Sequence, residues 1–137
     1  MESFRITVRV YGETLKPHEF AEEIKVPPTT SYSRGDPVSK HGRAAELRQK
    51  YGAWMKAVEC EDPPEFSSAL NGLLAELPAN FADIVQGHGA EADVYVGGFG
   101  VRDQSTIFMD EQLIQSLAAK QLSVVFDLYV KDEHEDE

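Results

Sequence analysis

The stretch FRITVRVYG, residues 4–12, decides the fold. Its apolar residues Phe4, Ile6, Val8 and Val10 alternate with polar or charged ones, and Gly12 ends the pattern. A period of two residues is typical of a β-strand with one sheltered and one open face. We therefore expect a strand whose apolar side chains pack under helices, while the intervening side chains point the other way.

The rest of the chain alternates between helical and strand patterns. Apolar residues recur at helical spacing in residues 17–24, 63–77 and 109–122, with a further helical turn at 81–85. Residues 51–59, 92–100 and 123–130 have the pattern of strands. In the last helix, Asp110 is expected to be the N-cap and Ile114 to belong to the apolar stripe.

This order predicts one α+β domain over residues 1–130. We expect a two-layer sandwich, with three helices on one face of a mainly antiparallel sheet of about four strands. The run KDEHEDE, residues 131–137, is predicted to be an acidic disordered tail.

The sheet face away from the helices is the first candidate binding surface. Side chains alternate strictly across a strand. The apolar pattern of the strands at 4–12, 92–100 and 123–130 therefore indicates which of their residues point away from the helices. Tyrosine and arginine are common at recognition surfaces, because they provide rigid area and hydrogen bonds. The candidates are Arg5, Arg9, Tyr11, Tyr95, Asp127 and Tyr129. The alternative is a solvated face on which Arg9 and Asp127 form ordinary cross-strand pairs.

The segment TSYSRGDPVSKHGR, residues 30–43, is the second candidate. Residues 34–50 contain five Lys or Arg and two acidic residues, a local charge of +3 that leaves −14 for the rest. Glycine backbone and basic side chains can hold an anion. Such a site would use Arg34, Gly35, Asp36, Lys40 and Arg43. The spacing matches no phosphate-binding loop, and the alternative is a basic loop that packs against the acidic surface.

No constellation of residues indicates catalysis. Cys60 is the only cysteine, so an internal disulfide is excluded and a reducing compartment is favoured. His88 and its acidic neighbours lack the helical spacing of zinc ligands. The sequence GGFG at 97–100 lacks a dinucleotide fingerprint and predicts a β-bulge or a strand end. We therefore expect no enzymatic activity, no catalytic residue, no metal and no cofactor.

The charge of the chain bears on its partners. Lys and Arg total 13 and Asp and Glu total 24, a net charge of −11. Such a chain is repelled by nucleic acids and anionic membranes and attracted to basic partners. The N-terminal residues form no signal peptide, and no apolar stretch could span a bilayer. We expect a cytoplasmic protein without nucleic-acid or membrane partners, whose oligomeric state the sequence does not give.

Several short motifs occur in a recognisable order. They are Tyr11-Gly12 followed by Leu15 and Pro17, then Pro28-Thr29, Gly35-Asp36, Trp54 and a final Asp127-Leu128-Tyr129. Together they resemble the bacterial family catalogued as domain of unknown function 4279, over about Phe4 to Val130. That family has no established activity, so the resemblance implies no catalytic residues. Small acidic domains of this general kind are also similar to the immunity proteins of bacterial toxin systems.

Two functions follow from these observations. The first is a non-enzymatic, immunity-like module that docks a basic protein, such as a toxin domain, on the open sheet face. The alternative is a domain that binds a small anionic metabolite with the loop at 34–43 and the same sheet face.

Overall fold

The central element of the fold is β1 (Ser3–Gly12), which pairs with a strand on each side. The computed structural model describes residues 2–40, 42, 46–61 and 63–130. These residues form one five-stranded sheet in the order β2-β3-β1-β4-β5. The other strands are β2 (Thr30–Tyr32), β3 (Gly52–Cys60), β4 (Glu91–Val101) and β5 (Ser123–Val130). Every neighbouring pair is antiparallel except β4 and β5, which are parallel.

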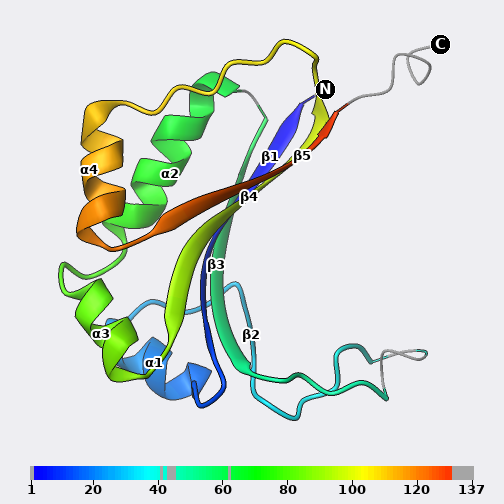
Figure 1. Cartoon of the computed structure of the whole chain (residues 1–137), viewed down its shortest axis with the longest axis vertical. Coiled ribbons are helices and arrows are strands. Elements are labelled where there is room, and N and C mark those ends of the chain that lie inside the picture. The colour runs from blue at the N-terminus through cyan, green and yellow to red at the C-terminus, as the bar shows by residue number, and fades with distance from the viewer. Residues whose placement is uncertain (1, 41, 43–45, 62, 131–137) are drawn as a thin grey trace.

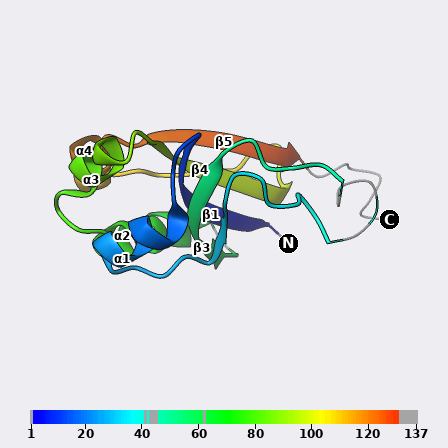
Figure 2. The same cartoon turned by 90° about the horizontal axis from the view of Figure 1, so that it is seen from below.

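The expected α+β two-layer arrangement is confirmed, with two more elements than the sequence predicted. The described α-helices are α1 (Pro17–Ile24), α2 (Phe66–Ala75), α3 (Phe81–Gly87) and α4 (Glu111–Ala119), and a short 3-10 turn, η2 (Pro63–Glu65), precedes α2. All four lie on the same side of the sheet (Figure 1), and the view from below shows the same separation (Figure 2). The additional helix is α3, where only a turn was expected, and the additional strand is β2. No described helix is long and apolar enough to cross a membrane.

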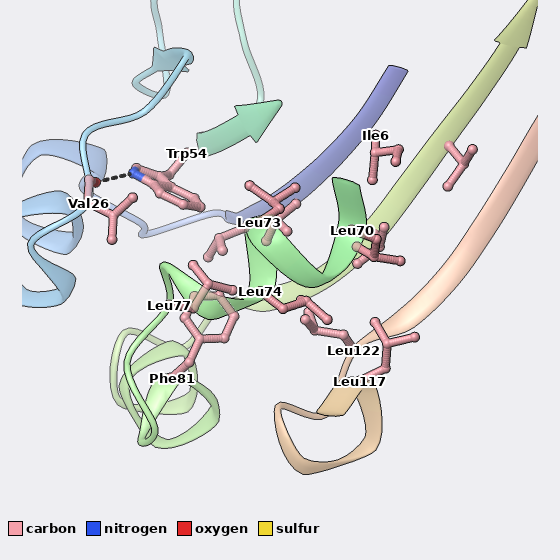
Figure 3. Close-up of a cluster of buried hydrophobic side chains, with 14 of the residues drawn as sticks. Ile6, Val26, Trp54, Leu70, Leu73, Leu74, Leu77, Phe81, Leu117 and Leu122 are labelled. Atoms are coloured by element: carbon pink, nitrogen blue, oxygen red, sulfur yellow. Dashed lines mark hydrogen bonds between the residues drawn. The ribbon is translucent and has the colours of Figure 1, made fainter. Parts of the chain in front are cut away.

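The core fills the space between the helices and the sheet. The four apolar residues of β1 are at most 1% exposed, as their alternation predicted. Leu70, Leu73 and Leu74 of α2 pack in the same layer, and the Trp54 Nε1 donates a hydrogen bond to the Val26 carbonyl oxygen at 3.3 Å (Figure 3). The burial of whole aromatic and leucine side chains is the main stabilising contribution to this fold.

One predicted core position is wrong, and two apolar residues of β5 are only partly sheltered. Ile114 is 52% exposed, so the apolar stripe of α4 is narrower than expected and consists of Leu113 and Leu117. Phe126 and Leu128 of β5 lie on the helical side but stay 39% and 40% exposed. The reason is that β5 is an edge strand, so its side chains have a neighbouring strand on one side only. The N-cap prediction is confirmed, because Asp110 Oδ1 accepts a hydrogen bond from the Leu113 amide at 2.8 Å.

The glycine-rich end of β4 allows side chains of the neighbouring strands to pack closely over its backbone. A register shift between Phe99 and Val101 marks the bulge that GGFG predicted. Gly98 faces the helical side, where a Cβ would lie 2.7 Å from Leu128 Cδ2 and 2.9 Å from Val101 Cγ2. Gly97 faces the other side, where the nearest atom to a Cβ is 3.5 Å away on the Phe99 ring. Neighbouring glycines therefore have different roles.

Replacing these two glycines tests the assignment of the faces. Gly98→Ala should lower the free energy of unfolding by about 1–3 kcal/mol, because the methyl group overpacks the core. Gly97→Ala should change it by less than about 0.5 kcal/mol, because its methyl group meets only ordinary contacts. Urea denaturation followed by tryptophan fluorescence measures both values. Equal losses in the two variants would contradict the assignment.

Candidate functional site

The outer face of the sheet is the side opposite to the helices, and no described helix covers it (Figures 1 and 2). Strand pairing aligns its side chains in rows across the sheet, such as Thr7, Tyr95 and Val125. The face consists of Arg5, Thr7, Arg9 and Tyr11 from β1, Thr30 and Tyr32 from β2, Ala53, Met55, Ala57 and Glu59 from β3, Glu91, Asp93, Tyr95, Gly97 and Phe99 from β4, and Ser123, Val125, Asp127 and Tyr129 from β5. All six residues predicted for a sheet-face site lie on it.

Tyrosine and phenylalanine are sorted between the two faces. The chain has five tyrosines, four of which are strand residues of the outer face. The fifth, Tyr51, joins them through a ring contact with Tyr11, at 6.1 Å between centroids. By contrast, four of the seven phenylalanines are fully buried in the core, namely Phe4, Phe20, Phe66 and Phe81. The aromatic residues with a hydroxyl group therefore all face outward.

An ion pair that the sequence analysis did not identify organises the middle of this face. Arg9 donates from Nε to Asp93 Oδ1 at 2.7 Å and from Nη2 to Asp93 Oδ2 at 2.6 Å. The hydrogen bonds to Asp93 raise the pKa of Arg9 above its ordinary value. The guanidinium carbon also lies 4.6 Å from the Tyr95 ring centroid and 5.9 Å from that of Tyr11. Asp93 is only 8% exposed as a result, although it points away from the core.

The two remaining charged candidates also have cross-strand partners. The Tyr95 hydroxyl donates a hydrogen bond to Asp127 Oδ2, and this bond raises the pKa of Tyr95 above 10.0. Arg5 Nη1 lies 2.9 Å from Glu59 Oε1 in an exposed pair. The cross-strand pairing expected of a solvated sheet face is therefore present. It holds the side chains of Arg9 and Tyr95 in fixed positions.

The charges are distributed unevenly over the outer face. Its β1 and β3 side carries Arg5 and Arg9 together with Glu59. Its β4 and β5 side carries acidic residues and, among the described positions, no basic one; these are Glu91, Asp93 and Asp127. The half of the face over β4 and β5 therefore has an excess of negative charge.

The described residues of the predicted anion loop and those that follow it form a two-stranded extension of β2 and β3, which we call the ribbon (residues 33–40 and 46–50). The amide of Gly35, at a φ of +93°, donates to the Gln49 carbonyl oxygen at 2.9 Å. The amide of Asp36 donates to the Ser33 carbonyl oxygen at 3.1 Å, and Asp36 Oδ2 accepts from the Ser33 amide at 2.8 Å. These amides bond within the turn, so they are not directed at an anion. The ribbon projects on the side away from the helices (Figure 1).

Only some of the basic residues predicted for the anion site are among the described residues. Arg34 and Lys40 are exposed, whereas Arg43 lies outside the described residues, as does the predicted tail at 131–137. An anion site here would have to depend on exposed side chains rather than on a backbone cradle, and exposed ion pairs contribute little affinity.

A hollow of about 310 Å³ lies where the ribbon leaves the sheet. We call it the tyrosine slot; its lining is Arg9, Tyr11, Tyr32, Tyr51, Ala53 and Met55. Its depth has a simple cause, because one row across the sheet places the small Ala53 between Tyr32 and Tyr11. Tyr32 and Tyr51 were not among the residues predicted from the sequence. Extending the alternation of the 51–59 strand to its outward residues would have placed Ala53 and Met55 here.

The residues considered for catalysis or metal binding have structural positions. His88 Nε2 lies 3.3 Å from Glu23 Oε1, and its ring packs edge-on against Phe20 at 5.4 Å between centroids. Cys60 is buried at the end of β3. Within the described part of the chain, no three His, Cys, Asp or Glu side chains are grouped so that they could hold a metal ion.

Comparison with known proteins gives one match. A family model described as Domain of unknown function (DUF4279) matches residues 2–131. No curated protein and no solved structure matches the chain.

The hydrogen bond between Tyr95 and Asp127 predicts a tyrosine titration. Tyr95 should lose its proton above pH 10.0 because the bond favours the protonated form, and Asp127→Asn should bring its pKa closer to 10.0. A group whose pKa is raised by folding stabilises the protein below its unfolded pKa, and this contribution is lost as the pH rises through the folded pKa. NMR of ring-labelled tyrosine measures the titration.

Tyr32 provides the internal control for this experiment. Its pKa is raised by burial and by Tyr51, at the far end of the sheet from Asp127. Its titration should therefore be the same in both proteins. An unchanged pKa of Tyr95 in Asp127→Asn would show that the hydrogen bond does not form in solution.

Proposed function

The chain belongs to the DUF4279 family, and we propose that its outer face binds a protein partner without catalysing a reaction. The observation that carries this proposal is the sorting of the aromatic residues: all five tyrosines lie at the outer face, whereas four of the seven phenylalanines fill the core. A tyrosine at a surface offers a large apolar ring and a hydroxyl group that both water and a partner can bond.

The fixed geometry of this face also supports protein binding. Arg9 is held by two hydrogen bonds to Asp93, and Tyr95 by one to Asp127. Aromatic and arginine side chains are the most common energetic anchors of protein interfaces. Because these side chains are already ordered, a partner would not have to lower their conformational entropy on binding.

The expected partner is a basic protein, such as the toxin domain that an immunity-like module would neutralise. A net charge of −11 attracts such a protein over a long range and accelerates the encounter. The acidic half of the outer face, over β4 and β5, gives its basic residues a place to dock. We propose that the tyrosines supply most of the affinity and the charges most of the association rate.

Site-specific photo-crosslinking in the native host tests this proposal. A benzoylphenylalanine at Val125, which is 41% exposed on the outer face of the edge strand β5, should crosslink a basic protein. The same group at Ile114, which is 52% exposed on α4, is the matched control on the helical side. Equal crosslinking from both positions, or none from Val125, would contradict the proposal.

The purified crosslinked protein then permits a quantitative measurement. Tyr95→Ala and Tyr129→Ala should each weaken its binding by about tenfold or more, the usual loss at an interface anchor. Phe108→Ala removes an aromatic ring that is 70% exposed beside α2 and should leave the affinity unchanged. Association should also slow as salt is raised. If Phe108→Ala weakened binding as much as the tyrosine variants, the partner would dock elsewhere.

A further inference from the structure

The tyrosine slot is a hollow at the β2 end of the outer face, large enough to receive a side chain. Its volume is about 310 Å³, and its floor is the small Ala53, which is 2% exposed. Tyr11 and Tyr51 form one wall with their rings 6.1 Å apart and tilted by 44°. Aromatic rings pair favourably in offset or edge-to-face geometry, so this wall offers a surface against which a further aromatic ring can pack.

The charge of the lining decides what the slot can hold. Arg9 is the one formally charged residue among the described residues of the lining, and both oxygens of Asp93 are bound to it. Its charge is therefore offset before any ligand arrives, which leaves little attraction for an anion. The paired guanidinium and carboxylate groups likewise offer a cation little attraction. The tyrosine hydroxyls stay protonated and uncharged, since burial raises the pKa of both Tyr11 and Tyr32.

We propose that the slot receives one neutral aromatic side chain, a phenylalanine, tyrosine or tryptophan of the protein partner. Met55 and Ala53 provide apolar contact below the ring, and the tyrosine hydroxyls at the rim bond polar atoms of the partner backbone. Buried aromatic anchors in pockets of this kind commonly dominate binding energy. This inference deepens the proposed function and rests on it for the biological source of the ring, whereas the capacity of the slot can be measured separately.

Three small probes of different charge test the occupant. They are N-acetylphenylalaninamide, which is neutral, phenylpropionate, which is an anion, and N-acetylargininamide, which is a cation. The neutral probe should shift the amide NMR signals of Ala53 and Met55 and bind most tightly of the three. Tighter binding of phenylpropionate would assign the slot to an anion, and tighter binding of the arginine derivative to a cation. Either result, or the absence of any shift, would overturn the inference.

Variants of the rim separate the slot from the rest of the face. Tyr51 is 42% exposed and lies just before β3, so Tyr51→Ala should keep the fold and weaken the neutral probe about 2- to 10-fold, as the loss of an aromatic pair does. Tyr51→Phe keeps the ring and should retain most of the affinity. Tyr129→Ala, at the other end of the outer face, should leave it unchanged. Equal affinity in Tyr51→Ala and the wild type would contradict the proposed occupant.

These results and those on the proposed function can fail independently. A slot that binds the neutral probe in a protein that crosslinks no partner from Val125 would leave the pocket chemistry intact and refute the protein-docking role. Crosslinking from Val125 with a slot that binds none of the probes would retain the docking role and refute the aromatic anchor.

Discussion

The alternation of side chains along β1 is the constraint on which the rest of the structure depends. Because β1 is the middle strand, its inward residues form the floor of the core and its outward residues form the centre of the outer face. A shift of one residue in its pairing would move Arg9 under the helices and Val8 into solvent. The cost of burying an unpaired guanidinium group excludes that arrangement. The core and the candidate binding surface are therefore fixed by the same register.

The pairing of Arg9 with Asp93 shows how that register becomes a defined surface. The two residues are opposite each other on β1 and β4, so the bond forms only when the strands are in register. Two parallel hydrogen bonds between a guanidinium and a carboxylate fix direction as well as distance. The guanidinium group then supports the rings of Tyr11 and Tyr95. An apparently ordinary cross-strand pair thus orders the aromatic groups around it.

The sequence predicted the features that depend on local periodicity. The burial of alternate residues in β1, the helix containing Leu70 and Leu73, and the cap at Asp110 follow from patterns a few residues long, and the structure confirms them. The partner of Arg9 lies 84 positions away, and the strand order depends on pairings between distant segments, which periodicity does not connect. Ile114 was misassigned because helical spacing predicts which face of a helix turns toward the core. It does not predict how wide a part of that face the rest of the protein covers.

The same distinction explains why the tyrosine slot was missed. Its lining comes from β1, β2, β3 and Tyr51, which lies just before β3, and only the pairing of β2 with β3 brings Tyr32 beside Ala53. A strand of three residues has little periodicity of its own, so nothing in its sequence indicates a sheet edge. Yet this short strand turns a flat sheet face into a hollow with walls. A flat sheet face provides contact area for a partner, whereas a hollow can enclose one of its side chains. The burial of such an anchor in a pocket is what allows a few residues to dominate the binding energy of an interface. If the outer face binds a protein, its specificity should therefore reside mainly at the β2 end, where the shape is most particular, while the acidic β4 and β5 side contributes to the encounter.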